Sequence, residues 1–298
     1  MRRGVAPISV AISTRDRLAA LRCCLDSLKA GALLPAEVVV SDQSVGPKTR
    51  DAVERLTSRE LPIRYVRARP GGLGAAQNDA VAATTSSVVA VLDDDCVADR
   101  GWIATLAHAF SDPTLAFVSG RVLPLGPGQP GTYAVASRTS TKRLELNAAT
   151  LPWDAGSGNN FAFRREWFNR IGGCDERLGP GSPGRGGLDM DLFRRLLRAG
   201  ARGRYEPEAL VLHERTSRGG RLARRFPYGY GMGACCMLWL KQGDREALRV
   251  LHRWLAMRSG RLGYSLVHLD WLAIHEELLV LSGTAGAIVF GLRASRRA

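Results

Sequence analysis

The stretch Val88-Val89-Ala90-Val91-Leu92-Asp93-Asp94-Asp95 places five apolar residues directly before three consecutive carboxylates. An unbroken, β-branched apolar run of this length is typical of a strand buried on both faces, as in a parallel sheet. Three like charges this close repel one another, and the usual remedy is a divalent cation with oxygen ligands that also bridges phosphate oxygens. The alternative is a polar turn in which Asp95 or Asp99 caps the next helix. The stretch therefore predicts a parallel α/β sheet with an acidic metal site at a strand end.

The first 122 residues repeat this strand pattern in alternation with helical patterns. The predicted strands are residues 8–12, 37–41, 63–66, 88–92 and 117–122, and the predicted helices are residues 16–30, 47–59, 74–84 and 100–110. In the first helix, the leucines at 18, 21, 25 and 28 form one apolar stripe. This alternation favours a mainly parallel sheet with helices on both faces, and ligands of such sheets bind beyond the carboxyl ends of the strands.

Residues 123–225 are less regular. Residues 123–158 are rich in Gly, Pro, Ser and Thr with little periodicity, which indicates a long connection with a functional or mobile role. A strand at 160–163 and a helix at 165–171 follow. A glycine-rich loop at 179–187 then leads into a helix that Asp189 or Asp191 caps and that runs to Ala199, and a strand is predicted at 209–213.

The last part of the chain is predicted to be helical, with helices at 226–241, 244–257 and 262–292. The third helix holds fifteen uncharged residues, 278–292, followed by Arg293, Arg296 and Arg297. A bilayer span needs about 20 apolar residues. We therefore expect a core helix, or an interfacial helix whose arginines meet anionic lipid, rather than a span.

The composition is that of a globular protein and excludes disordered or collagen-like chains, because 45% of the 298 residues are hydrophobic and 23% are charged. The length allows one large domain or two small ones. The six cysteines form no CxxC motif, and Pro7 and Ser9 interrupt the N-terminal apolar run, which predicts a first strand rather than a signal peptide. These features favour a reducing, cytoplasmic location.

The formal net charge is +14, from 42 Lys and Arg against 28 Asp and Glu. Residues 201–298 hold 16 of these basic and 8 of these acidic residues, so the basic excess is concentrated towards the C-terminal end. An excess of this size suits nucleic acid, an anionic membrane surface or an anionic small ligand.

Two further motifs lie in the N-terminal half. The predicted strand at 37–41 ends in Asp42, on the same sheet edge as Asp93, where an acidic residue either accepts a hydrogen bond from a ribose or base or starts a turn. The stretch Gly71-Gly72-Leu73-Gly74-Ala75-Ala76-Gln77-Asn78 allows close backbone approach to a ligand, but it matches neither the dinucleotide-binding nor the P-loop pattern.

Two more candidates lie in the second half. Asp189, after the glycine-rich loop, is placed to take a proton from a hydroxyl, unless it and Asp191 only cap the helix. His213 ends a strand, as Asp93 does, and is therefore either a metal ligand or a structural imidazole.

Taken in order, these pieces resemble a family 2 glycosyltransferase with the GT-A fold. The resemblance covers residues 5–218, and it is specific because seven motifs occur in order at sensible spacing. They are Ser9-Val10-Ala11-Ile12-Ser13-Thr14-Arg15-Asp16-Arg17, Val39-Val40-Ser41-Asp42, Asp93-Asp94-Asp95, Asn160-Phe161-Ala162-Phe163-Arg164-Arg165, Gly172-Gly173-Cys174-Asp175-Glu176, Asp189-Met190-Asp191-Leu192 and His213.

The resemblance implies an enzyme that transfers a sugar from a nucleotide-diphosphate sugar to a hydroxyl of a glycan or lipid-linked acceptor. It implies a GT-A catalytic domain in residues 1–225, with a Rossmann-like nucleotide-sugar-binding half in 1–122 and an acceptor half in 123–225. Residues 226–298 would form a helical extension. Mg²⁺ or Mn²⁺ would neutralise the leaving diphosphate, and a single general base would give inversion at the anomeric carbon.

The same resemblance implies a role for each candidate residue. Asp189 would be the base, Asp95 and His213 would hold the metal, and Arg215 or Arg218 would assist the leaving diphosphate. The nucleotide-sugar-binding residues would be Thr14, Arg17, Asp42, Asn78, Asp93 and Asp94, and the acceptor-side residues would be Trp153, Asn159, Asn160 and Asp191, with Trp102 as a further aromatic candidate.

Two positions depart from the family's pattern. Leu188 stands where many relatives have Glu before the base, which leaves Asp191 as an alternative to Asp189. Gln77 stands where many have Arg before Asn78, which weakens the case for a donor contact from that helix.

Two other functions fit parts of the sequence. A nucleotidyltransferase acting on sugar phosphates shares the sheet and the acidic metal site, but it usually needs a basic glycine-rich loop near the first strand. A basic adaptor for nucleic acid or a membrane surface explains the charge, but three adjacent aspartates would repel a polyanion. We therefore predict a cytoplasmic glycosyltransferase with no nucleic-acid partner, and the inner face of the cell membrane is a candidate location for its basic tail.

Overall fold

The computed structural model describes residues 3–293, with the side chains of residues 288–290, 292 and 293 left out of account. The strands are β1 (Val5–Thr14), β2 (Leu34–Asp42), β3 (Ile63–Arg67), β4 (Val88–Leu92), β5 (Cys96–Ala98), β6 (Leu115–Pro124), β7 (Thr132–Tyr133), β8 (Leu144–Leu146), β9 (Asn160–Arg164), β10 (Arg202–His213) and β11 (Thr216–Ser217). The helices are α1 (Leu18–Lys29), α2 (Lys48–Leu56), α3 (Gly72–Ala83), α4 (Trp102–Ala109), α5 (Pro152–Ala155), α6 (Arg165–Arg170), α7 (Leu188–Arg198), α8 (Arg218–Ala223), α9 (Arg225–Lys241), α10 (Glu246–Val267) and α11 (Trp271–Arg293).

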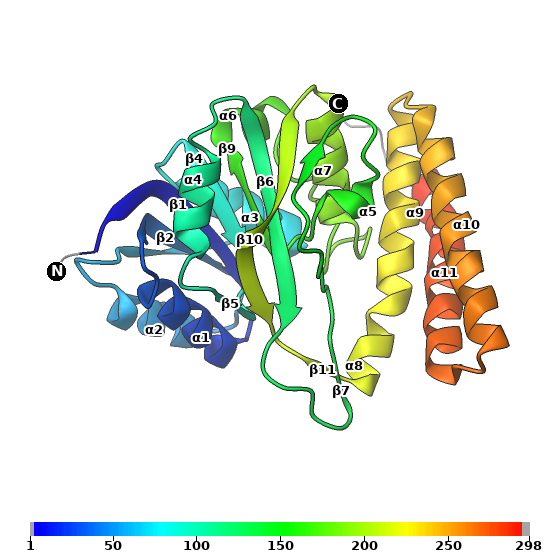
Figure 1. The fold of residues 1–298 in the computed structure, drawn as a ribbon, viewed down its shortest axis with the longest axis horizontal. Helices are drawn as coiled ribbons and strands as arrows, with labels where there is room; N and C mark the ends of the chain where they lie inside the picture. Colours follow the sequence, from blue (N-terminus) through cyan, green and yellow to red (C-terminus); the bar gives the residue numbers. More distant parts are fainter. Residues whose placement is uncertain (1–2, 294–298) are drawn as a thin grey trace.

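One large sheet organises the molecule, in the order β3-β2-β1-β4-β9-β6-β10-β5, with β8 paired to β10 (Figure 1). Strands β3, β2, β1 and β4 are parallel, which confirms the parallel sheet predicted for the first half. Strand β9 lies antiparallel between β4 and β6, and β6 pairs in parallel with β10. Strands β1, β2, β4, β6 and β10 therefore point the same way, and their carboxyl ends share one edge of the sheet.

Alternation along the strands divides the core into two apolar clusters, one on each face of the sheet. Val10, Ile12 and Val38 belong to the cluster that packs under α1, α2 and α4. Ala11 and Val39, one position on, belong to the cluster that packs under α3, α6 and α7. Because both faces of these central strands are buried, the strands read as continuous apolar runs in the sequence.

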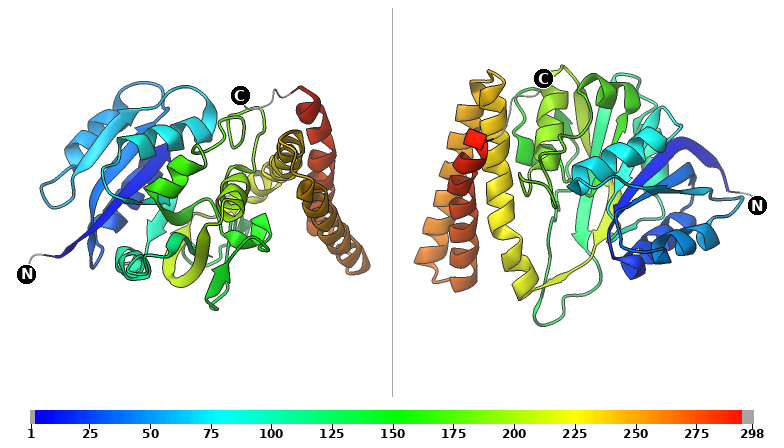
Figure 2. Two further views of the ribbon diagram at one scale, coloured as in Figure 1. Left: turned by 90° about the horizontal axis from the view of Figure 1, so that it is seen from above. Right: turned by 180° about the vertical axis from the view of Figure 1, so that it is seen from behind.

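The helices α9, α10 and α11 stand side by side as a layer next to the sheet half of the molecule (Figures 1 and 2). Met232 of α9, Trp254 of α10 and Val280 of α11 are buried in the same cluster as the sheet residues Phe161 and Phe163. The C-terminal helices therefore share a core with the sheet, and the division of the chain at residue 225 stays a prediction.

Close packing inside this layer depends on glycine. A Cβ added to Gly229 of α9 would lie 1.9 Å from the backbone oxygen of Val280 in α11. Val280 and Ala287, in the apolar run that the sequence singled out, are fully buried. One face of the run's described part therefore packs into the core, while Leu278 is 51% exposed. The side chain of Arg293, and Arg296 and Arg297, lie outside what the structure describes, so the interfacial contact stays a prediction. In the part of the chain that the structure describes, no helix has the length and apolar character needed to cross a bilayer.

Several predicted boundaries are wrong. The break expected after residue 257 does not exist, because α10 continues through Gly260 and Gly263 to Val267 and the turn comes at Leu269, where φ is +52°. A glycine inside a helix costs only about 1 kcal/mol, and packing of the buried face outweighs it. Helix α7 begins at Leu188 after Gly187 and has no side-chain cap, so neither Asp189 nor Asp191 caps it.

The sequence analysis also missed short elements: β5, β7, β8, β11, α5 and α8. Each has six residues or fewer. A segment of that length shows too few repeats of a helical or strand period to be recognised.

Candidate active site

A single cleft of about 850 Å³ opens at the edge of the sheet where the parallel strands end. Its lining joins residues from both halves of the chain. The predicted site residues that line it are Thr14, Arg17, Asp93, Asp94, Asp95, Trp153, Asn159, Asp189 and His213. The parallel strand order places them there, because β1, β4 and β10 end on the same edge.

The three aspartates form a cluster that Thr14 and Arg17 hold. The Thr14 hydroxyl donates to Asp94 Oδ2 at 2.6 Å, and the Arg17 guanidinium donates to Asp94 Oδ1 at 2.8 Å and to Asp95 Oδ2 at 2.5 Å. Burial raises the pKa of Asp94 to about 6, although Thr14 and Arg17 act against the shift. Burial, and then the charges of Asp95 and Asp94, raise the pKa of Asp93 well above its ordinary value.

The alternative prediction, that Asp95 or Asp99 caps the next helix, is wrong. Helix α4 begins at Trp102 after Gly101, and no side chain caps it. The Asp99 carboxylate accepts from the Gly101 N–H at 2.8 Å, one residue before the first turn.

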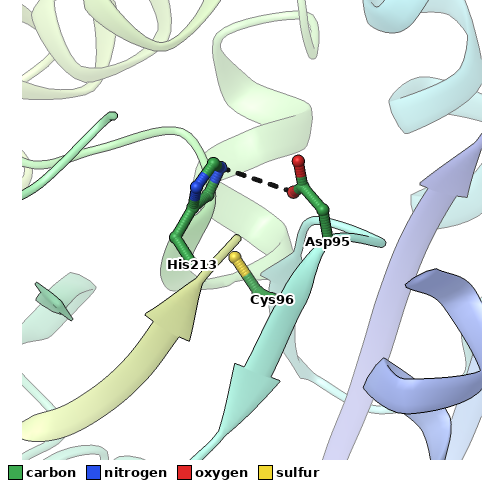
Figure 3. Close-up of side chains that lie close together, drawn as sticks. All are labelled: Asp95, Cys96 and His213. Atoms are coloured by element: carbon green, nitrogen blue, oxygen red, sulfur yellow. Dashed lines mark ion pairs between the residues drawn. The ribbon is translucent and has the colours of Figure 1, made fainter. Parts of the chain in front are cut away.

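Asp95 and His213 face each other at the end of the sheet (Figure 3). The antiparallel pairing of β5 with β10 sets His213 opposite Cys96, the residue after Asp95. Asp95 Oδ1 lies 3.4 Å from His213 Nε2 and has no hydrogen-bond partner among the described residues, although it is buried. His213 Nδ1 lies 2.8 Å from the Glu214 carbonyl oxygen, which can only accept, so Nδ1 carries a proton.

This geometry fits a divalent cation. With the proton on Nδ1, the lone pair of His213 is on Nε2, which faces the free oxygen of Asp95. Metal-ligating histidines are usually oriented in this way, by a hydrogen bond from the other ring nitrogen to a carbonyl oxygen. Oxygen and imidazole donors suit Mg²⁺ and Mn²⁺. The Cys96 thiol is the third group within 4.8 Å. A thiol is a soft ligand and suits Mg²⁺ and Mn²⁺ less well than a carboxylate oxygen, so Asp95 and His213 are the better ligands.

Asp189 lies in the first turn of α7 and lines the same cleft. The Gly158 N–H donates to its Oδ2 at 3.1 Å, and Gly158 must be small, because an added Cβ would lie 3.0 Å from the Asp189 Cβ. Burial raises the pKa of Asp189, and the backbone N–H groups of Met190 and Gly158 oppose this. A carboxylate held in this way with a raised pKa has the properties of a general base.

Two acceptor-side candidates also line the cleft. Asn159 is 2% exposed, and neither its amide nitrogen nor its amide oxygen has a partner among the described residues. Trp153 packs against Trp254 of α10 with ring centroids 5.4 Å apart. A buried side-chain amide without partners is costly, which indicates that a ligand completes its hydrogen bonds.

Seven predicted site residues do not line the cleft: Asp42, Asn78, Trp102, Asn160, Asp191, Arg215 and Arg218. Asp42 is fully buried, and its carboxylate accepts from the Ser44 N–H at 2.8 Å and from the Tyr65 hydroxyl at 3.1 Å. The Asn78 side chain is occupied by the backbone of Cys174 and by Glu176. Both side chains therefore form hydrogen bonds within the protein, and their contact with the nucleotide sugar stays a prediction.

Asn160 and Asp191 are likewise held by contacts within the protein, and their acceptor-side role stays a prediction. Asn160 is buried between strands, where it donates to the Arg121 and Ala209 carbonyl oxygens and accepts from Trp102 Nε1, so Trp102 is a core residue too. The Asp191 carboxylate pairs with Arg195 at 2.6 Å and accepts from Trp239 Nε1 at 2.9 Å. Asp191 thus ties α7 to α9, and of the two aspartates only Asp189 reaches the cleft.

A basic wall faces this acidic edge, and the sequence analysis did not find it. Five arginines on α8, α9, α10 and the α8–α9 junction line the cleft: Arg221, Arg224, Arg225, Arg258 and Arg261. We call this set the arginine wall. Arg258 and Arg261 fall in the break that the sequence analysis expected after residue 257, so only the continuous helix α10 places both on one helix face.

Comparison with known proteins identifies the family. The profile described as Glycosyl transferase family 2 matches residues 9–172, more than half of the chain. The chain belongs to this family. A pre-mycofactocin glycosyltransferase of Mycobacterium tuberculosis is 32% identical over 263 residues, which are 85% of this chain and 53% of that protein. An O-antigen chain rhamnosyltransferase of Salmonella typhimurium is 25% identical over 226 residues, 73% of this chain and 69% of that protein.

Solved structures confirm the GT-A fold of this glycosyltransferase. A mannosyltransferase from Pyrobaculum calidifontis, in complex with GDP-Man and Mn²⁺, superposes with a TM-score of 0.60 at 17% identity, covering 95% of this chain and 87% of that one. TarS of S. aureus, residues 1–349, gives a TM-score of 0.54 at 16% identity, covering 77% and 64%. The glycosyltransferase chain described here spans about half the length of the mycobacterial relative, 53%.

Proposed function

We propose that this glycosyltransferase moves a sugar from a nucleotide-diphosphate sugar to an acceptor hydroxyl with the help of a divalent metal and with inversion at the anomeric carbon. The observation that carries the proposal is that Asp189, the Asp93–Asp95 cluster and His213 line one cleft. Such a cleft can hold the donor at the candidate metal site and the acceptor at the base.

The donor lies at the strand ends in this proposal. Asp95 and His213 hold the metal, which when bound neutralises negative charge on the diphosphate. Arg17 keeps Asp94 and Asp95 in place, and Asp93 lies near the ribose. The mannosyltransferase neighbour was solved with GDP-Man and a TarS structure with UDP-GlcNAc, which supports a nucleotide sugar as the donor class here.

Asp189 acts as the general base. As the acceptor oxygen attacks the anomeric carbon, its proton passes to the Asp189 carboxylate, and the bond from the anomeric carbon to the diphosphate oxygen breaks with its electron pair leaving on the nucleoside diphosphate. Gly158 holds one carboxylate oxygen and fixes the direction of the other. A single displacement from the opposite face gives inversion, and Asn159 and Trp153 contact the acceptor or the transferred sugar.

A glycan or lipid-linked acceptor follows from the same proposal, since the Salmonella relative acts on an O-antigen chain. The turn between α10 and α11 supports a membrane surface as a partner, because Tyr264, Val267 and Trp271 are 67%, 81% and 71% exposed there. Exposed aromatic and aliphatic side chains of this kind suit the boundary between lipid and water. We expect Trp271→Ser with Val267→Ser to reduce co-sedimentation with vesicles, and unchanged co-sedimentation would exclude this contact.

A thermal-shift panel tests the donor site. UDP, GDP, dTDP and CMP are each added with and without Mn²⁺, because a ligand that binds only the folded state raises its stability. A metal-dependent shift with one nucleotide, lost in Asp95→Asn, supports the proposal. A shift that ignores Mn²⁺ and the Asp95 substitution contradicts metal-dependent donor binding, and chiral analysis of the product decides inversion.

A further inference from the structure

The arginine wall carries more positive charge than its neighbours neutralise. Glu276 of α11 pairs with Arg221 and with Arg225, the latter at 2.9 Å, and Glu277 pairs with Arg258 at 3.1 Å. Among the described residues, Arg224 and Arg261 make no ion pair. Within the wall, there are thus five guanidinium groups and two carboxylates, and no ion pair between the described residues joins the wall to Asp189 or to the Asp93–Asp95 cluster.

The inner part of the wall is buried, whereas Arg224 and Arg261 are exposed at the cleft and can reach a ligand. Arg258 is 4% exposed, lies over the Trp254 ring at 4.2 Å, and its Nε has no partner among the described residues. Glu276 and Glu277 are 5% and 8% exposed. Burying charged groups is costly, so a buried network that still lines a cleft differs from an ordinary basic surface.

The wall also lies near the base. Burial raises the pKa of Tyr228, which lines the cleft from α9, while the charges of Arg258, Arg225 and Arg261 lower it and the charge of Asp189 raises it. The Tyr228 side chain therefore lies close enough to the arginine wall and to Asp189 for the charges of both to affect its pKa.

Arginine forks match the oxygens of phosphate groups in geometry as well as charge. In the proposed function, the diphosphate of the donor binds at the candidate metal site of Asp95 and His213. A second anionic group therefore belongs to the other substrate.

We propose that the arginine wall is a subsite for a phosphate or diphosphate group carried by the acceptor, placed so that the acceptor hydroxyl reaches Asp189. The inference rests on the proposed function for the division between donor and acceptor. Arg224 and Arg261 contact the phosphate oxygens, while Arg221, Arg225 and Arg258 are held by Glu276 and Glu277 and supply the surrounding positive field.

Binding of inorganic pyrophosphate to the full chain in EDTA tests the subsite, since the chelator removes any metal contribution. We expect Arg224→Ala with Arg261→Ala to weaken pyrophosphate binding at least tenfold by titration calorimetry. The matched control is Arg245→Ala with Arg253→Ala, which removes the same charge from exposed positions outside the cleft and should change the affinity less than twofold. Equal weakening in the two variants, or no pyrophosphate binding to the wild type, overturns the proposal.

Vesicles distinguish the two sources of the phosphate. Phosphatidylcholine vesicles with and without phosphatidic acid are compared for the same variants. Binding that needs phosphatidic acid and the cleft arginines identifies a lipid headgroup, whereas pyrophosphate binding without vesicle discrimination identifies a soluble phosphate ester; both support the subsite. The nucleotide panel with Asp95→Asn is independent of these arginines, so failure of the proposed function and failure of the subsite give different results.

Discussion

The two walls of the cleft are opposite in charge and are built in different ways. The acidic wall is the Asp93–Asp95 cluster, and its three residues follow one another in the chain at the end of the parallel strand β4. The arginine wall consists of arginines on α8, α9 and α10, and glutamates on α11 form ion pairs with three of them. The acidic wall thus follows from the position of each residue within its own strand, whereas the basic wall exists only once four helices have packed.

This difference separates chemistry from substrate selection. Strand ends are rigid because hydrogen bonds to both neighbouring strands hold them, and they suit groups that must be placed accurately. The helical layer packs against the sheet through side chains and brings the arginines to the cleft. We therefore expect substitutions on the acidic side to affect donor binding and turnover, and substitutions on the basic side to affect the acceptor.

The largest effect is expected for Asp189→Asn. It removes the base but keeps the shape of the side chain, so transfer should fall by about 10²–10⁴-fold. Nucleotide binding in the presence of Mn²⁺ should change little, because Asp189 forms no hydrogen bond with the Asp93–Asp95 cluster among the described residues. Turnover numbers and thermal shifts measured on the same preparation check both statements. Asp191→Asn is the control for position in the helix, and full transfer by Asp189→Asn with every acceptor would refute the assignment of the base.

The next effect is expected for Asp95→Asn. Loss of a metal ligand should cost at least as much as loss of a residue that orients one, about 100-fold in affinity for the nucleotide in Mn²⁺. Binding in EDTA should be weak and equal in the two proteins. Asp112→Asn, at a surface turn outside the cleft, is the matched control. Equal affinities in Mn²⁺ would place the metal elsewhere.

The contributions of the two walls to the stability of the fold should depend on pH in opposite directions. The folded-state pKa of Asp94 is raised from 3.8 to about 6, so its contribution to stability is present below about pH 4 and is lost as the pH rises through about 6. Burial tends to raise the pKa of Glu276, but Arg221 and Arg225 outweigh burial and the net pKa is lowered. Its contribution is therefore present above pH 4.5 and is lost as the pH falls below that value.

Thermal unfolding in EDTA from pH 3.5 to 7 measures these two contributions. In the wild type, the free energy of unfolding should fall by about 3 kcal/mol between pH 4 and 6 because of Asp94, since one pKa unit corresponds to 1.36 kcal/mol. Asp94→Asn should abolish this fall. Glu276→Gln should flatten the acid side of the profile and leave the region between pH 5 and 6 unchanged. Identical profiles for both variants and the wild type would show that neither wall titrates in this way.

The smallest effect concerns the contact that joins the helical layer to the base. A Cβ on Gly231 of α9 would lie 2.2 Å from the Gly186 carbonyl carbon, just before α7. Gly231→Ala should therefore destabilise the fold by about 1–3 kcal/mol and lower turnover more than nucleotide binding, because the first turn of α7 carries Asp189. The matched control is Gly263→Ala in α10, where an added Cβ meets nothing within 4 Å; it should stabilise by about 0.5–1 kcal/mol. Unfolding free energies from urea titration check both, and a neutral Gly231→Ala would show that the two layers can separate.

The acidic half of the site was readable from the sequence because its information is local. A β-branched run before Asp93 specifies a buried strand, and the carboxyl end of a parallel strand is where ligands bind. Thr14 ends β1 and Arg17 follows it, so both lie at the same edge. Asp42 and Asn78 show the limit of this argument, because a polar residue in the right place can equally serve a turn, and the partners that decide this are distant in sequence.

The sequence by itself determined the parallel first half of the sheet, the acidic cluster and the family, since each depends on the order of residue types within short segments. Tertiary structure alone decided that Asp189 and not Asp191 faces the cleft, that His213 meets Asp95 through the pairing of β10 with β5, and that arginines from three helices form a wall. The physical reason is that hydrophobic periodicity fixes which face of one element is buried, whereas the neighbours of an exposed or half-buried polar group are fixed only by the packing of elements far apart in the chain.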